Sequence, residues 1–168
     1  PSRHTPPAPM ALKAISRQVR KLVKAQDDDD AWWIIPDAIE DYLSFDLEIL
    51  GPEEYSVSPI KGDDKKRKSP YDGGLFMIHL TFQADYPTSP PEVKFKTKVW
   101  HPQINKDDGK ICNEVLTTSW SPVCTVETVL LAIRELLASP SDDTGINTEA
   151  AGQLRDSVET FEKYAASW

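Results

Sequence analysis

The sequence predicts an α+β domain, in which helices and an antiparallel sheet come from separate parts of the chain. Apolar residues recur at helical spacing near the start, alternate at strand spacing in the middle, and return to helical spacing towards the end. The chain has 168 residues, 39% of them hydrophobic and 27% charged. This length suits one such domain and makes a second one unlikely on size alone.

A helix is predicted first. Residues 1–9 contain four prolines, which suit a flexible leader, so we expect the folded domain to span residues 10–168. From Met10 onwards apolar residues share one helical face and basic residues the rest of the surface: Leu12, Ile15, Val19 and Leu22 against Lys13, Arg17, Arg20, Lys21 and Lys24. This pattern predicts an amphipathic helix with a basic outer face, ending at the acidic run 27–30.

Four strands are predicted next. A short apolar patch over residues 32–35 stops at Pro36, and three alternating segments come later: Phe45, Leu47 and Ile49; Phe76, Ile78, Leu80 and Phe82; Val93, Phe95 and Val99. Turn signals such as Asp72-Gly73 separate them, so we expect a four-stranded antiparallel meander with one covered face. His79 falls on the opposite face of its strand, which favours a surface histidine over a ligand.

The segment 53–68 is predicted to be an inserted polar loop. It is too polar to pack, and its length favours either a functional loop or a disordered one. The basic run 65–68 is typical of a solvated loop, with a nuclear localisation signal or an anion patch as alternatives.

The remaining chain is predicted to be an irregular segment followed by helices. Residues 101–122 lack periodicity and contain Cys112. Thr125 is a plausible N-cap for a core helix that ends before Ser139-Pro140, with apolar Val129, Leu130, Ile133, Leu136 and Leu137. After a loop with Asp142, Asp143 and Gly145, a last helical region places inward Leu154, Val158, Phe161, Ala165 and Trp168.

Composition narrows the possible functions. A net charge of −8 disfavours binding to nucleic acid. No apolar run is long enough to cross a bilayer, and the start of the chain lacks the apolar core of a signal peptide, so no membrane partner is expected. Cys112 and Cys124 form neither a disulfide framework nor a zinc pattern, which indicates a reducing compartment, the cytosol or nucleus.

Chemistry from the residues alone stops at one candidate thiol. Cys112 lies in an irregular stretch, where exposure is plausible, but no histidine is close in sequence and Glu114 would disfavour the thiolate. From the residues alone, a buried, inert thiol is the favoured interpretation of Cys112, and more strongly of Cys124, which begins an apolar helix.

Six ordered motifs resemble the core of a ubiquitin-conjugating enzyme. They are the Ser69–Gly74 run Ser-Pro-Tyr-Asp-Gly-Gly, Asp85-Tyr86-Pro87 with Pro90-Pro91, His101-Pro102-Gln103, Gly109-Lys110-Ile111-Cys112, Trp120-Ser121-Pro122, and Val129-Leu130-Leu131. The resemblance implies that Cys112 accepts ubiquitin, or a related modifier, as a thioester and passes it to a lysine or another cysteine. It implies no metal or bound cofactor, because ATP is used earlier by the activating enzyme.

The same resemblance assigns further catalytic residues. Gln103 stands where the family has an asparagine that holds the active-site loop and donates a hydrogen bond to the oxyanion. Asp143 matches an acid that in several members orients or deprotonates the lysine, although a solvated loop acid is the alternative. Glu114 matches another acid beside the cysteine. We expect Cys112 to load but to discharge slowly onto lysine, because the donor of Gln103 lies one methylene further out.

Partner surfaces are also implied by the resemblance. Lys13 and Arg17 belong to the basic helix that meets the activating enzyme, and Leu131 and Glu135 to the helix face that contacts the carried modifier. The ligase-binding loops would contain Pro87, Thr88, Pro90, Ser121 and Pro122. Thr88 replaces a large apolar residue found in many members that work with RING or HECT ligases, which removes an anchor.

A module of the same fold that binds ubiquitin or a ligase without efficient transfer is the alternative function. Gln103 and Thr88 favour that alternative. The presence of Cys112 favours the enzyme, since the non-catalytic members of the family generally lack this residue.

Overall fold

The computed structural model describes residues 9–57, 66–111, 114–118, 120–142 and 145–168. Helix α1 (Pro9–Ala25) begins the domain and has the predicted amphipathic character. Ile15, Val19 and Leu22 are buried, but Leu12 is 40% exposed and Ala11 is buried in its place. The inward face of α1 is therefore rotated slightly from the predicted one.

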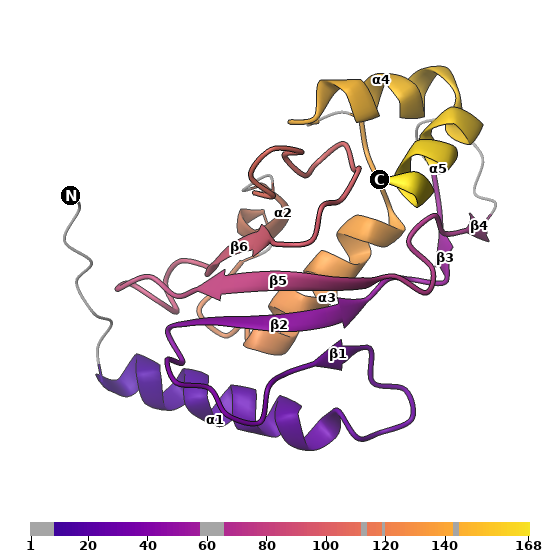
Figure 1. Cartoon of the computed structure of the whole chain (residues 1–168). Helices are drawn as coiled ribbons and strands as arrows, with labels where there is room; N and C mark the ends of the chain where they lie inside the picture. Colours follow the sequence, from indigo (N-terminus) through magenta and orange to yellow (C-terminus); the bar gives the residue numbers. More distant parts are fainter. Residues whose placement is uncertain (1–8, 58–65, 112–113, 119, 143–144) are drawn as a thin grey trace.

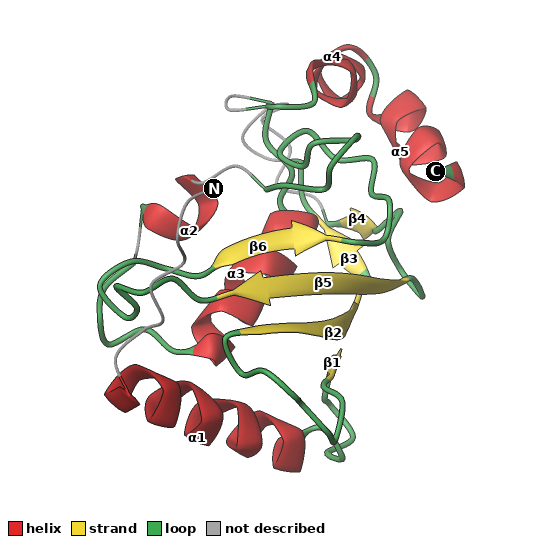
Figure 2. Ribbon diagram, turned by 60° about the vertical axis from the view of Figure 1, so that its left-hand side comes forward, coloured by secondary structure: helices red, strands yellow, loops and turns green. Residues whose placement is uncertain are grey.

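Four antiparallel strands form the central sheet, as predicted. They are β1 (Trp33–Ile34), β2 (Ser44–Leu50), β5 (Leu75–Thr81) and β6 (Glu92–Phe95), in the order β1-β2-β5-β6. The register pairs Leu47 with Ile78 and Ile78 with Phe95, so the alternating apolar side chains share one buried face. Figures 1 and 2 show that face covered by helix α3.

Strand β6 is shorter than the alternation predicted. The predicted strand reached Val99, whereas β6 ends at Phe95. The amides of Lys96 and Thr97 both point to the carbonyl of Met77, at 2.8 and 3.3 Å, which breaks the regular ladder. Val99 is still buried, so the alternation of apolar residues predicted its burial correctly but predicted a strand where there is none.

Helix α3 (Val126–Ala138) is the predicted core helix. Thr125 is its N-cap and forms a capping box with Thr128, and all five apolar residues assigned to its inner face are buried. The cap residue at its C-terminal end is Ser139. Within the described residues of the predicted irregular segment 101–122, Glu114–Thr117 forms the short helix α2, and Ile104, Lys110 and Ile111 form isolated β-bridges.

The last helical region consists of two helices, α4 (Thr148–Asp156) and α5 (Val158–Ser167), capped by the side chains of Asn147 and Ser157. Leu154, Val158 and Phe161 are buried, as predicted. Trp168 is not on the inner side, because it is 46% exposed. Its ring lies 4.7 Å from that of Trp100, measured between centroids, so it covers a core tryptophan from outside.

The ends of the polar segment 53–68 do pack, contrary to the expectation for that segment. Strand β3 (Glu54–Tyr55) pairs with β4 (Arg67–Lys68) as a separate two-stranded ribbon, while residues 58–65 lie outside the described part. Tyr55 and Val57 are buried at 2% and 1% exposure, and the Ser56 amide donates to the Ala138 carbonyl at 2.9 Å. The buried side chains of Tyr55 and Val57 and the bond to the end of α3 contribute to anchoring the described ends of the segment.

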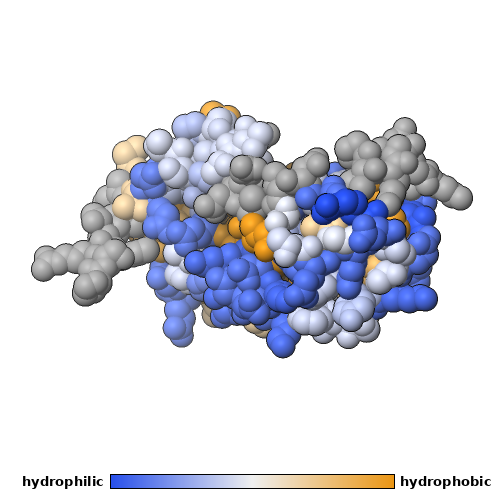
Figure 3. Space-filling model, turned by 90° about the horizontal axis from the view of Figure 1, so that it is seen from above, coloured by the Kyte–Doolittle hydropathy of each residue, from blue (hydrophilic) through white to orange (hydrophobic). Residues whose placement is uncertain are grey.

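Within the described ranges, no helix has the length and apolar character needed to span a membrane. The same ranges hold no cluster of three or more potential metal ligands. His79 is part of a hydrogen-bonded group in which Nδ1 lies 2.6 Å from Asp46 Oδ1 and Nε2 lies 3.0 Å from Ser44 Oγ. Seen from above, the described surface is mainly hydrophilic, with a small apolar spot near its centre (Figure 3).

Candidate active site

The turn that begins with His101 is locked to the core helix by a neutral imidazole. The ring is fully buried, Nε2 donates to the Leu136 carbonyl at 2.9 Å, and Nδ1 accepts from the Gln103 amide at 3.0 Å. Burial lowers the His101 pKa to about 3, although the bond to Leu136 acts in the opposite direction. His101 therefore holds the backbone of Gln103 in place and is not available as a general base.

The side chain of Gln103 reaches the loop after α3. Its Oε1 accepts from the Ser141 amide at 3.4 Å, which orients the NH2 end of the amide as the donor end. The carboxylate of the neighbouring Asp142 receives a bond from Arg155 Nε of α4 at 3.1 Å. Residues 141–142 are thus held from both sides, by Gln103 and by α4, while Asp143 lies outside the described residues.

The chain leading to Cys112 is fixed by a tight turn. Gly109 has a positive φ of 73°, and a Cβ there would lie 1.9 Å from the Phe95 carbonyl oxygen, so the turn requires glycine. The Phe95 amide donates to the Gly109 carbonyl at 2.8 Å, and Ile111 pairs with Ile104 in an antiparallel bridge. Ile111, which precedes Cys112, is therefore anchored opposite Ile104, which follows Gln103.

Several predicted site residues are not described. Cys112 and Asp143 lie outside the described residues, and Glu114 begins α2 but its side chain is not among the described ones. Their assigned roles stay predictions. Cys124 is partly exposed and not buried, and its Sγ accepts from the Ser121 amide at 3.4 Å.

The two loops predicted to meet a ligase lie side by side. Trp120 Nε1 donates to the Pro87 carbonyl at 2.9 Å, and the Trp120 and Tyr86 rings are 6.0 Å apart. The structure thereby brings Pro87, Thr88 and Pro90 close to Ser121 and Pro122. Thr88 and Pro122 are exposed on these loops.

Gln18 is a connecting residue that the sequence reasoning missed. Its Oε1 accepts from the Val126 amide at 3.1 Å and from the Tyr86 hydroxyl at 3.3 Å. The bonds tie α1 to the start of α3 and to the Tyr86 loop. The available signal was a neutral polar residue next to the inward face of α1, one position before the buried Val19.

Other predicted partner residues lie on the surface. Lys13 and Arg17 are exposed on α1. On α3, Leu131 is 53% exposed and Glu135 is also exposed. The Glu135 carboxylate accepts from Ser139 Oγ at 2.7 Å.

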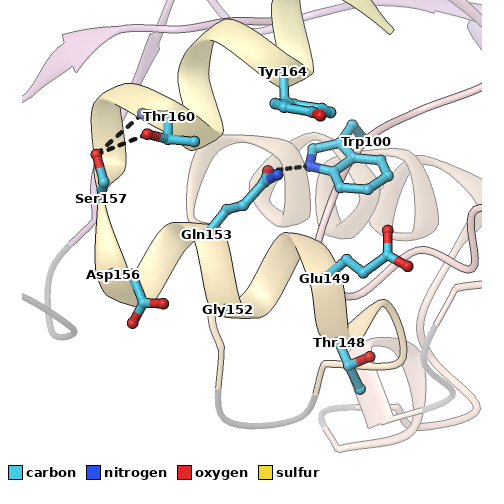
Figure 4. A pocket seen from close by; sticks show the side chains of 9 residues that line it. All are labelled: Trp100, Thr148, Glu149, Gly152, Gln153, Asp156, Ser157, Thr160 and Tyr164. Atoms are coloured by element: carbon cyan, nitrogen blue, oxygen red, sulfur yellow. Dashed lines mark hydrogen bonds between the residues drawn. The ribbon is translucent and has the colours of Figure 1, made fainter.

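A cavity of about 460 Å³ lies between α4 and α5 and contains none of the predicted catalytic or partner residues (Figure 4). Its wall includes Trp100, whose Nε1 donates to Gln153 Oε1 at 2.9 Å, and Tyr164, whose ring lies 5.5 Å from that of Trp100. Because Trp100 directly precedes His101, these contacts brace the active-site turn against the C-terminal helices.

Comparison with known proteins assigns the family. The sequence profile described as ubiquitin-conjugating enzyme matches residues 60–168, which is more than half of the chain. The chain belongs to the ubiquitin-conjugating enzyme family. The family therefore accounts for the arrangement of N-terminal helix, four-stranded sheet and C-terminal helices described above.

Two solved structures are similar over most of their length. One is a provisionally assigned ubiquitin conjugating enzyme from Plasmodium yoelii, with a TM-score of 0.72 and 31% identity over 93% of this chain and 92% of that one. The other is the E2 domain of a ubiquitin conjugating enzyme from Toxoplasma gondii, with a TM-score of 0.69 and 31% identity over 91% and 94%. Ubiquitin, an activating enzyme and ligases are the partners that such a family implies.

Proposed function

We propose that this member of the family carries ubiquitin, or a related modifier, as a thioester on Cys112 and transfers it to a lysine or to a ligase cysteine. The observation that carries the proposal is the pairing of Ile111 with Ile104. It anchors the residue bonded to Cys112 opposite the residue bonded to Gln103, so the candidate nucleophile and the candidate oxyanion donor belong to adjacent segments.

The transfer chemistry needs a thiolate and a donor for the oxyanion. The Cys112 thiolate attacks the thioester carbonyl on the activating enzyme and expels that enzyme's thiolate. An amine then attacks the new thioester, loses a proton and expels the Cys112 thiolate. The Gln103 amide is the proposed donor to the oxyanion, and the neighbouring acids Asp143 and Glu114 are proposed to orient the lysine. These steps call for no metal or bound cofactor.

A charging assay tests the thioester. The full chain is incubated with activating enzyme, ATP and ubiquitin, and the products are separated with and without thiol reductant. We expect the natural chain to form an adduct that reductant removes. The Cys112→Ser variant should form no reductant-sensitive adduct. An adduct of unchanged reductant sensitivity in Cys112→Ser would contradict the proposal, because the acyl group would then be on another thiol.

A binding module with impaired transfer is the second candidate, supported by Gln103 and by the exposed Thr88. The Gln103→Asn variant separates the two. Starting from pre-charged protein, we expect this variant to discharge onto free lysine at least about tenfold faster than the natural chain, because a misplaced oxyanion donor costs roughly 10²-fold or more in rate. Equal discharge rates would show that Gln103 is an adequate donor and would remove the case for impairment.

A further inference from the structure

We propose that the cavity between α4 and α5 binds an extended, basic segment of a partner protein, in which two basic residues stand three positions apart. The volume of this cavity is about 460 Å³, and its lining contains none of the residues assigned to loading, transfer or ligase binding. The proposal therefore goes beyond the proposed function and assigns a separate contact surface to the C-terminal helices.

The spacing of the lining residues on the two helices creates the cavity. On α4 they include Glu149, Gly152 and Asp156, which recur at intervals of three or four positions and so share one helical face. Thr160 and Tyr164 have the same relation on α5, and the two faces are turned towards each other (Figure 4). The space between the helices is thus bounded by side chains from both of them.

Two carboxylates give the cavity its charge. Glu149 and Asp156 are both exposed, and none of the described lining residues is basic. Glu149 Oε1 accepts from Lys106 Nζ at 2.7 Å, and that ammonium lies 6.0 Å from the centre of the Trp100 ring. One cation of the chain thus already uses a carboxylate and an aromatic ring at the edge of the cavity, whereas Asp156 has no partner among the described residues.

Gly152 leaves the α4 face of the cavity open, and neither its backbone nor its packing requires a glycine. It lies inside α4 and is not among the residues of positive φ. A Cβ added to it would meet no atom within 4 Å beyond its own helix backbone. Because glycine lowers the stability of a helix relative to alanine, this position gives up helix stability and leaves open space beside the two carboxylates.

Aromatic rings complete the wall. Trp100 is buried on the inner side, and the ring of Tyr164, which is 48% exposed, lies 5.5 Å from it. A guanidinium group stacks on an aromatic ring and also pairs with a carboxylate through its planar fork. Arginine therefore matches this combination of side chains more closely than lysine does.

The separation of the two carboxylates sets the spacing of the basic residues. From Glu149 to Asp156 the helix rises about 10.5 Å. An extended chain covers about 10 Å in three residues. A segment with basic residues at positions i and i+3 therefore reaches both carboxylates, and the two residues between them lie over Gly152.

A peptide titration tests the cavity. The full, unloaded chain is labelled with nitrogen-15 and titrated at low salt with acetyl-Arg-Ala-Ala-Arg-amide. The matched control peptide carries citrulline, an uncharged analogue, in place of both arginines. We expect saturable NMR shifts at the Gly152 amide and at the Trp100 indole N–H, and an affinity about 3- to 10-fold higher for the arginine peptide, the range for two exposed ion pairs.

Two variants locate the binding. Gly152→Leu fills the cavity and should abolish the shifts, while the chain stays folded because leucine is a better helix former than glycine. Asp156→Asn should weaken binding of the arginine peptide about 3-fold, the share of one exposed ion pair. Asp29→Asn is the matched control, because it makes the same change at an exposed acid in the turn after α1.

Four results would overturn the proposal. They are the absence of saturable shifts with the arginine peptide, equal affinity for the two peptides, unchanged binding by a folded Gly152→Leu chain, and equal binding by Asp156→Asn and Asp29→Asn. The titration needs no thioester, so its failure would leave the proposed function standing, and failure of charging would leave the cavity standing.

Discussion

His101 is the residue on which the geometry of the candidate site depends most directly. Its ring joins two backbone groups, the Leu136 carbonyl and the Gln103 amide, and only the neutral Nε2-H tautomer satisfies both. A protonated ring would place a second N–H against the Gln103 amide in a fully buried site. The interaction is therefore stable only while the ring stays uncharged.

The buried ring predicts a loss of stability in acid. The His101 pKa in the folded chain is about 3, below its usual value of about 6.5 when unfolded, so only the unfolded chain takes up this proton between those values. The free energy of unfolding should fall by about 2 kcal/mol between about pH 7 and about pH 5 from this residue alone. Urea denaturation of the natural chain and of His101→Gln checks this, since the variant should lack that share of the pH dependence. If the free energy of unfolding fell with pH equally in the natural chain and in His101→Gln, this prediction would be contradicted.

At the scale of elements, the β3–β4 ribbon depends on one carboxylate of α5. Glu162 Oε1 accepts from Tyr55 and Arg67, which are 107 and 95 positions away in the sequence. Burial and the bond to Glu162 raise the pKa of Tyr55 far above its usual value, so this hydroxyl stays a donor. Contacts of this range keep the insertion attached to the rest of the domain.

Replacing that carboxylate should release the ribbon. We expect Glu162→Gln to lower the free energy of unfolding by about 1–3 kcal/mol, because a half-buried, charged acceptor loses its strength for two donors. Glu159→Gln is the matched control. Glu159 Oε1 lies 3.5 Å from Arg67 Nη2, but its side chain is 68% exposed, so its loss should cost clearly less than the loss of Glu162. If urea denaturation gave equal losses of unfolding free energy for Glu162→Gln and Glu159→Gln, the Glu162 bonds would not be what holds the ribbon.

At the scale of the whole molecule, charge is distributed unevenly over a chain with a net charge of −8. The first 26 residues carry six basic side chains and no acidic one, and Lys13 and Arg17 are exposed on α1. An activating enzyme with an acidic surface would be attracted by this end of the molecule, and such attraction acts mainly on the association rate.

The dependence of the loading rate on salt concentration tests the role of the basic helix α1. Under conditions where association limits loading, the double variant Lys13→Glu/Arg17→Glu should load about 3- to 10-fold more slowly than the natural chain at low salt, and the difference should shrink as salt rises. Lys163→Glu on α5, an exposed position far along the chain, is the control for net charge and changes that charge half as much as the double variant does. A similar loss in Lys163→Glu, or a loss that salt leaves unchanged, would contradict a steering role for α1.

The sequence by itself determined the periodic elements. The apolar spacing of α1 and α3, the cap at Thr125 and the alternation in β2 and β5 are local patterns, and each predicted its element because neighbouring residues fix backbone geometry. The six motifs likewise identified the family, since they are read in order along the chain. The assignment of Gln103 as a site residue also came from its motif, and it stays a prediction.

Only the tertiary structure decided how distant residues meet. The bond from Ser141 to Gln103, the link from Gln18 to Val126 and the attachment of Arg67 to Glu162 join positions 38, 108 and 95 apart. No periodicity encodes such pairs, because they depend on which surfaces the packed core brings together. The same cause explains why the described ends of the polar insertion pack and why Trp168 lies outside. Both positions are set by the partners that the packed core supplies and not by local pattern.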